Sequence, residues 1–356
     1  MKIAIIGAGL AGLACARELI KNGIYPTIFE KKSCIGKDYL LSTTTLRILD
    51  RSYRTSVKYL NQRYNLKLKP FSPLREITMI APQRQTVVRG KLGYIYMRGE
   101  EENSLENQIA RGLNANILFD NFVDINDVKN HFDYIIAATG NEAIPKTLGV
   151  WTPTFNVCLR AAVVLGDFKT DCIKMWVNTD YSKSCYGYIS PYSTKEARLL
   201  LTVDNITPYE MDYYWNKFFN EENLSYDIIE TKDIEYSIGT TSSAKAGNIY
   251  LVGNCAGLID DFLGFGAVNA IESGILAAKS IVKGLDYNEL IKPMKKHVTK
   301  LHEFRKALNS FDNKDLNRLI TFLGLPVVKQ LIYNNPLIKG KNFSFIARMY
   351  NSIKNR

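Results

Sequence analysis

The sequence has little of what a membrane-spanning, metal-binding or disulfide-stabilised protein would need. Its longest apolar runs, Ile3–Ile6, Ile135–Ala138 and Ile249–Val252, have the length of strands and are too short to cross a bilayer. Six cysteines form no C-x-x-C pair and there are only three histidines, so we predict neither a metal site nor a disulfide framework. No RNA- or DNA-binding module is recognisable, and nucleic acid is not an expected partner.

Positive charge is concentrated at the C-terminal end. Residues 286–356 hold 14 Lys/Arg and 5 Asp/Glu, whereas the charges of the preceding residues nearly balance. Two interpretations stay open: a helical surface that its lysines keep solvated, or an electrostatic contact with anionic lipid headgroups, an acidic redox partner or a polyanion. The chain enters an apolar run directly after Met1-Lys2, which predicts a cytoplasmic location. If the basic segment contacts anionic lipid headgroups, the protein is expected to lie peripherally at the inner membrane surface.

Hydrophobic periodicity divides the 356 residues into two kinds of structure. Lys2–Ile6, Leu10–Asn22 and Pro26–Glu30 read as strand, helix and strand, and Tyr134–Ala138 as another buried strand. Residues 38–63 look partly helical and residues 65–98 look like short strands punctuated by prolines. From 155 to 203 the pattern is that of antiparallel strands, and after residue 286 it is amphipathic helix broken near Pro326 and Pro336.

The first glycine loop lies directly between a strand and a helix. Gly7, Gly9 and Gly12 form G-x-G-x-x-G, and Glu30 ends the next strand at the distance typical of a dinucleotide-binding turn. Such glycines allow a tight turn, a close approach of the backbone to a pyrophosphate and close packing of helix on strand. Glu30 is then expected to accept hydrogen bonds from the adenosine ribose.

A second small-residue segment, "LVGNCAGLIDDFLGFGAVNAIESGILAA", follows the buried strand near residue 250. It brings Gly253 and Asn254 to the carboxyl edge of the sheet, and Gly264 and Gly266 open a helix near Ala267, while "IIAATG" adds Thr139 and Gly140. One loop suffices for a nicotinamide nucleotide, whereas two loops can hold both ends of a longer cofactor. We therefore predict FAD, with the dipole of the second helix directed at the flavin ring.

Together with "GYIYMRGEEENSLENQIARGL" (93–113), these motifs resemble the flavoprotein group that includes hydroxybenzoate hydroxylase and, more closely, the geranylgeranyl reductases. The resemblance implies that Arg98 lies near FAD and Val123 beside its adenine. "YGYISP" is similar to a Y-x-W-x-F-P strand motif of the reductases, which implies that Tyr186, Tyr188 and Pro191 line the flavin and substrate cavity. Phe262 is a further substrate-contacting candidate, and no residue is identified as the catalytic acid.

Three positions depart from the reductase pattern. Asn254 replaces an aspartate, Asp261 replaces a proline, and the strand motif is a third place of departure, with Tyr188 for tryptophan and Ser190 for phenylalanine. If Asn254 contacts the ribityl chain, Asn254→Asp is expected to strengthen FAD retention through a charge-assisted hydrogen bond. We expect Asp260 and Asp261 to cap a turn, and Cys255 to act as small-residue packing.

The predicted fold class is α/β (α+β): a Rossmann-type FAD-binding domain with an inserted antiparallel-sheet substrate domain and a C-terminal helical segment. The FAD-binding domain comprises residues 1–64, 93–150 and 236–285, the substrate domain 65–92 and 151–235, and the basic helical segment 286–356. The first functional hypothesis is an oxidoreductase that reduces C=C bonds of an isoprenoid or similar apolar substrate by hydride transfer from flavin N5. A flavin monooxygenase of an aromatic or lipid substrate and a flavoprotein without turnover are the alternatives. No second dinucleotide motif exists, so NAD(P)H or reduced ferredoxin is expected to donate electrons transiently.

Overall fold

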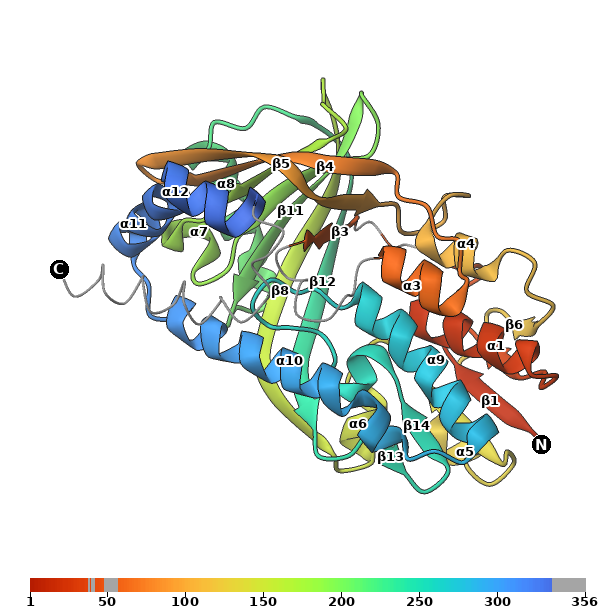
Figure 1. Ribbon diagram of the computed structural model, residues 1–356. Coiled ribbons are helices and arrows are strands. Elements are labelled where there is room, and N and C mark those ends of the chain that lie inside the picture. The colour runs from red at the N-terminus through yellow and green to blue at the C-terminus, as the bar shows by residue number, and fades with distance from the viewer. Residues whose placement is uncertain (38, 40–41, 48–56, 335–356) are drawn as a thin grey trace.

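The structure is a computed structural model that describes residues 1–356 except 38, 40–41, 48–56 and 335–356. It contains a six-stranded and an eight-stranded sheet, with a row of C-terminal helices running from the first to the second (Figure 1). Segments far apart in the sequence contribute to the six-stranded sheet, which begins with residues 3–6 and is completed by residues 245–251.

The six-stranded sheet is parallel except at one edge, where β13 and β14 pair antiparallel. In spatial order its strands are β13 (Lys245–Ala246), β14 (Ile249–Leu251), β7 (Tyr134–Ala137), β1 (Ile3–Ile6), β2 (Thr27–Phe29) and β6 (Asn116–Leu118). Strands β1 and β14 are fully buried apolar runs, and β7 is buried after Tyr134, as expected for a parallel sheet covered on both faces.

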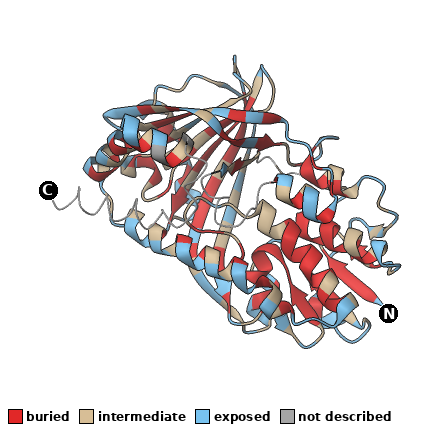
Figure 2. Cartoon of the chain, viewed as in Figure 1, coloured by how far each residue is buried: buried red, intermediate tan, exposed pale blue. Residues whose placement is uncertain are grey.

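Helices α1 (Leu10–Lys21) and α9 (Ala267–Lys283) pack against each other on this sheet (Figure 1). A Cβ atom added at Gly274 of α9 would lie 2.1 Å from the backbone oxygen of Ala11 in α1, so the glycine permits this close approach. Further helices of this part of the molecule are α3 (Val57–Tyr64), α4 (Leu105–Ala110), α5 (Ile125–Val128) and α6 (Ala143–Thr147). Buried side chains are concentrated in the sheet and in the facing sides of α1 and α9 (Figure 2).

The eight-stranded sheet is antiparallel apart from one parallel pair, β4 with β9. Its order is β12 (Asp227–Thr241), β8 (Trp151–Leu165), β11 (Glu196–Asp204), β10 (Gly187–Pro191), β9 (Cys172–Trp176), β4 (Ser72–Ala81), β5 (Arg84–Tyr96) and β3 (Thr43–Leu46). Side chains alternate between its faces: Leu199 and Leu201 pack with α8 (Met211–Glu221), beside the short helix α7 (Thr179–Ser182), whereas Leu200 packs with Leu159 on the opposite face.

The C-terminal helices cross from one sheet to the other. Helix α10 (Tyr287–Leu308) begins at the six-stranded sheet and carries exposed and intermediate side chains along its outer side (Figures 1 and 2). Helix α11 (Asn313–Leu323) places Leu316 and Ile320 against the apolar face of β4 and β5, and α12 (Pro326–Lys329) and a π-helical turn (Gln330–Asn334) follow. In the part of the chain that is described, no helix is both long and apolar enough to cross a membrane.

Several elements differ from the prediction. The stretch 38–63 contributes a strand, β3, before α3, and residues 65–98 form one long hairpin of β4 and β5 in place of several short strands. Pro73 is tolerated inside β4 because β9 pairs with β4 only from Glu76 onward. The C-terminal helix is also interrupted before Asp312, which caps α11, while the predicted break near Pro326 is present and Pro336 lies outside the described residues.

The predicted domain boundaries fall inside two strands. Strand β5 continues past residue 92 to Tyr96, and β12 continues past residue 235 to Thr241. Both strands therefore lead from the eight-stranded sheet directly toward the six-stranded one. This continuity matters for the site, because β12 brings its own side chains to the glycine loops.

Candidate functional site

The first glycine loop is shaped by contacts that only glycine permits. Gly7 has a φ of +108°, and a Cβ atom there would lie 2.5 Å from the backbone oxygen of Ala138. A Cβ at Gly12 would lie 2.0 Å from the oxygen of Gly7, whereas one at Gly9 would meet no protein atom within 4 Å. Gly7 and Gly12 thus serve the packing of the loop, and Gly9 borders open space at the N-terminus of α1.

Glu30 is fixed beside this loop by backbone groups. Its Oε2 accepts a hydrogen bond of 2.8 Å from the N–H of Ala8, and its Oε1 accepts one of 2.9 Å from the N–H of Lys32. Each carboxylate oxygen has a second lone pair, so Glu30 can still accept a hydrogen bond from a ribose hydroxyl.

The second loop reaches the same place from the other side of β7. Gly266 is the N-cap of α9, and it lines the cavity together with Gly264 and Ala267. Both α1 and α9 therefore present N-terminal ends to one cavity, where free N–H groups and the helix dipoles favour negative charge.

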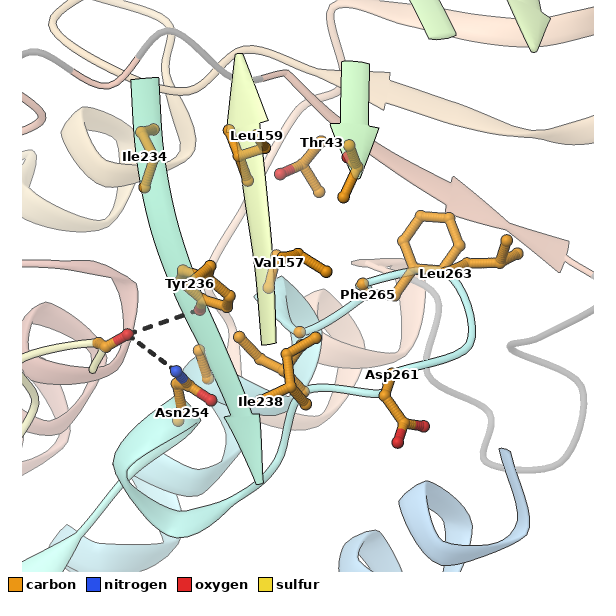
Figure 3. Close-up of a pocket in the computed structure, with 18 of the residues that line it drawn as sticks. Thr43, Val157, Leu159, Ile234, Tyr236, Ile238, Asn254, Asp261, Leu263 and Phe265 are labelled. Atoms are coloured by element: carbon orange, nitrogen blue, oxygen red, sulfur yellow. Dashed lines mark hydrogen bonds between the residues drawn. The ribbon is translucent and has the colours of Figure 1, made fainter. Parts of the chain in front are cut away.

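Asn254 connects three segments at the floor of this cavity (Figure 3). Its Nδ2 donates to the backbone oxygens of Gly140, at 3.0 Å, and Ser237, at 3.3 Å, and the hydroxyl of Tyr236 donates to the same Gly140 oxygen at 3.5 Å. The Oδ1 atom of Asn254 is buried and accepts no hydrogen bond from the described residues. The asparagine thus joins the six-stranded sheet to β12 and keeps one acceptor for a bound group.

This geometry reverses the effect expected for Asn254→Asp. A carboxylate there would repel two carbonyl oxygens and take from each the amide donor that it has now, and a buried polar group that loses its partner costs about 1–3 kcal/mol. We expect Asn254→Asp to weaken FAD retention by roughly tenfold or more, measured by equilibrium dialysis. Asn269→Asp, which loses a comparable bond to the Leu258 oxygen away from the cavity, is the control and should retain FAD. Tighter binding by the Asn254 variant would contradict this assignment.

One cavity of about 1140 Å³ unites most of the predicted site residues. They are Gly7, Gly9, Glu30, Val123, Thr139, Gly140, Gly253, Asn254, Gly264, Gly266 and Ala267 around the glycine loops, with Arg98, Tyr186, Tyr188 and Phe262 further on. Gly12 is buried behind the first loop, and Pro191 lies at the end of β10, paired with Ala197; neither is among the described residues that line the cavity. The volume exceeds the upper end of typical ligand pockets, ~1,000 Å³, so the cavity has room for more than a cofactor alone.

Arg98 carries a buried positive charge with a buried partner. Its Nε lies 2.6 Å from Glu106 Oε1, and its Nη1 donates to Thr43 Oγ1 at 3.0 Å and to the Tyr39 hydroxyl at 3.3 Å. Burial by itself would lower the pKa of Arg98, but the Glu106 carboxylate and Tyr39 outweigh it and hold that pKa above its ordinary value. This pair fixes the wall of the cavity next to Tyr188, whose pKa burial raises to about 12.

The loop before α9 is held by its two aspartates in different ways. Asp260 accepts hydrogen bonds from the N–H groups of Leu263, at 2.8 Å, and Phe265, at 2.9 Å, as expected for a turn cap, and burial raises its pKa to about 7. Asp261 does not cap the turn: its Oδ2 lies 2.5 Å from Nδ1 of His302 in α10. The Tyr186 hydroxyl donates to the Leu263 oxygen at 2.5 Å, so two segments outside the loop, one of them α10, help to position it.

Cys255 is packed rather than poised for reaction. Its Sγ lies 3.1 Å from Thr139 Oγ1 and donates to the Asn141 oxygen at 3.2 Å. Burial raises the pKa of this thiol, which keeps it protonated and weakly nucleophilic.

Sequence reasoning did not identify several cavity residues. Tyr236 could have been found from the alternation of Ile234, Tyr236 and Ile238, which places all three on one face of β12 (Figure 3). Arg305, which lines the cavity, and His302, which contacts the cavity residue Asp261, gave no local signal, because their positions depend on how α10 crosses the molecule.

The residues present fit FAD. The space beside Gly9 can accept a pyrophosphate, the buried Oδ1 of Asn254 can accept a hydrogen bond from a ribityl hydroxyl, and two helix N-termini face the anionic parts of the cofactor. Fold and site together fit the class of FAD-dependent oxidoreductases.

The comparisons with known proteins agree with that class. Residues 1–159 match the family described as pyridine nucleotide-disulphide oxidoreductase. A segment of 35 residues is 57% identical to the glutamate synthase [NADPH] small chain of Halomonas elongata; the match spans 10% of this chain and 7% of that protein. The predicted α/β fold with a Rossmann-type domain is thereby confirmed, and the match agrees with FAD as the predicted cofactor.

Solved structures share the fold at low sequence identity. A geranylgeranyl bacteriochlorophyll reductase-like protein from Thermoplasma acidophilum has a TM-score of 0.71 and 17% identity, with 92% of each chain covered. The p-nitrophenol 4-monooxygenase PnpA from Pseudomonas putida has a TM-score of 0.64 and 12% identity, covering 93% of this chain and 96% of that chain. A variant of the halogenase PltM in complex with FAD has a TM-score of 0.62 and 13% identity, and the match covers 99% of this chain and 85% of that chain.

Proposed function

We propose that this oxidoreductase reduces carbon–carbon double bonds of an isoprenoid or similar apolar chain. The observation that carries the proposal is the apolar half of the cavity. Beyond the glycine loops the cavity continues between the eight-stranded sheet and α11, in a region that we call the apolar chamber, lined by Ile77, Met79, Leu92, Val177, Leu316 and Leu319. A long hydrocarbon gains about 0.8 kcal/mol for each CH₂ group that it buries in such surroundings.

The chain's own residues would hold the reacting parts in place. The bound flavin supplies a hydride for the double bond, and a proton from an acid or from water completes the reduction. Tyr186 and Tyr188 lie between the glycine loops and the apolar chamber, where they can orient a double bond and restrict water. NAD(P)H or reduced ferredoxin remains the proposed electron donor.

A flavin monooxygenase is the second candidate, favoured by the likeness to PnpA and by the tyrosine hydroxyls around the cavity. The test uses FAD-loaded protein reduced anaerobically with dithionite. Addition of geranylgeraniol should give a product that has gained two hydrogen atoms, detected by mass spectrometry, with reoxidation of the flavin. An oxygenated phenol after aeration in place of this product would support the monooxygenase, and neither product would support a flavoprotein without turnover.

The basic segment 286–356 is proposed to bring the protein to an anionic membrane surface. Because Leu316 and Ile320 pack on β4 and β5, the apolar side of α11 is not free to enter a bilayer, and the contact would be electrostatic. Phe343, Phe345 and Ile346, apolar positions further along the segment, lie outside the described residues.

We expect the protein to sediment with anionic vesicles at low salt and to be released at ~0.5 M salt, where the screening length is only a few ångströms. Each lysine or arginine near the surface would contribute up to roughly 1 kcal/mol. Neutral vesicles are the control. Equal, negligible sedimentation in every condition would rule out this contact and favour an acidic protein donor as the partner of the basic segment.

A further inference from the structure

Arg305 is a buried cation in the cavity wall. It lies on α10 with 2% of its surface exposed. Its Nε donates a hydrogen bond to Asn309 Oδ1 at 2.8 Å. Its Nη2 donates to the backbone oxygen of Ser184 at 2.7 Å and also to the hydroxyl of that serine. The guanidinium carbon lies over the Phe155 ring, 4.1 Å from the ring centre. All these partners are neutral. The guanidinium also interacts with the thiol of Cys185, and this partner is neutral too, because burial raises the pKa of the thiol.

The carboxylates nearby are engaged elsewhere. Asp261 is paired with His302 at 2.5 Å, and Glu303, on the next position of α10, is paired with Lys306 at 3.1 Å. The Asp204 carboxylate lies behind Ser184 and accepts the N–H of that residue at 2.9 Å. Within the described part of the chain, no carboxylate forms an ion pair with Arg305. A buried charge without a counter-charge is costly, and such a site gains when a ligand supplies the opposite charge.

The position of Arg305 relates it to the apolar chamber. Leu308 lies one turn further along the same side of α10 and, like Phe311 just beyond the helix, lines the cavity. The wall therefore changes from a guanidinium to purely apolar side chains over a short distance. A cavity wall that is charged at one end and apolar beyond it is complementary to a molecule with one charged end and a hydrocarbon chain.

We propose that Arg305 binds an oxyanion, a carboxylate or a phosphate, at the end of an apolar chain that occupies the apolar chamber. This inference rests on the proposed function, because it names the polar end of the same substrate. The pyrophosphate of FAD does not supply this anion, since its place is beside Gly9 at the N-terminus of α1. The guanidinium has no charged partner among the described residues, and its planar fork of donors suits either anion.

The test compares binding of geranylgeraniol, geranylgeranoic acid and geranylgeranyl diphosphate to oxidised, FAD-loaded protein, followed by the change in flavin absorbance. The native protein should bind at least one anionic probe tenfold or more tightly than the alcohol, and the stronger of the two identifies the anion. Arg305→Met should abolish this preference while leaving the affinity for the alcohol unchanged. Lys296→Met, which removes an exposed lysine of the same helix away from the cavity lining, is the matched control and should behave as the native protein does.

A structural role for Arg305 predicts a different result. If the arginine only fastens α10, the native protein will show no preference for either anion, and this outcome overturns the proposal. Should Arg305→Met fail to fold, Ser184→Ala keeps the cation, removes one neutral partner, and should preserve the preference; loss of the preference in a folded Ser184→Ala variant would count against it. The proposed function fails separately, if the reduced protein binds the anionic probes but saturates no double bond.

Discussion

Replacing Gly9 by valine should give a folded protein that no longer binds FAD. The added side chain meets no protein atom near its Cβ but projects into the space where the pyrophosphate approaches the N-terminus of α1. We expect the affinity for FAD to fall roughly a hundredfold or more, which corresponds to ~2.7 kcal/mol. Absorbance at the flavin band and dialysis against FAD measure this loss, and circular dichroism monitors the fold.

Gly12 provides the contrasting variant. Its Cβ would lie 2.0 Å from the Gly7 oxygen, so Gly12→Val should destabilise the protein itself and lower its melting temperature even without FAD. Full FAD occupancy in Gly9→Val would show that the pyrophosphate binds elsewhere. If Gly9→Val and Gly12→Val destabilised the protein equally, Gly9 would be needed for folding, like Gly12, and would have no separate role in cofactor binding.

Filling the apolar chamber should stop the turnover of long chains without affecting the flavin. Leu319 belongs to α11 and lines the apolar chamber, whose other walls include side chains of β4. The substitution Leu319→Trp adds a large ring to the space that the hydrocarbon would occupy. We expect kcat/KM for geranylgeraniol to fall about a hundredfold, since a displacement of about 1 Å at the reacting atoms has an effect of that size. A shorter prenyl alcohol such as geraniol should be affected much less.

The control for this variant is Lys314→Trp on the exposed side of the same helix. It adds the same ring outside the cavity and should leave turnover of both alcohols unchanged. Undiminished reduction of geranylgeraniol by Leu319→Trp would mean that the substrate lies elsewhere. FAD content, measured for every variant, separates a blocked chamber from a lost cofactor.

The parts of the fold that the sequence predicts well are those with local causes. The strand, glycine turn and helix at residues 3–21 are specified by an uninterrupted apolar run and by the glycines that follow it. Strand β3 has no such signal: Thr43–Leu46 is short, and it becomes a strand because β5 pairs with it from about 50 residues further along the chain. Propensity within the segment could not indicate that partner.

The candidate site divides in the same way. Gly7, Gly9 and Glu30 are recognisable because a single strand–helix–strand unit sets their spacing along the chain. The pair of Asp261 and His302 joins residues that are 41 positions apart, and Arg305 enters the cavity wall only because α10 crosses from one sheet to the other. The revised expectation for Asn254→Asp has a related cause, since the two carbonyl oxygens that accept hydrogen bonds from its amide belong to Gly140 and Ser237, on two other segments.

The order in which the six-stranded sheet is assembled has a consequence for biosynthesis. Strand β14 and helix α9 come from residues 249–283, so the half of the cofactor site that holds Asn254 and the second helix N-terminus leaves the ribosome last. A nascent chain that has exposed only its first glycine loop can offer FAD one end of its binding site. Stable capture of the cofactor therefore has to wait until α9 packs on α1, which makes cofactor loading a late step in the maturation of this protein.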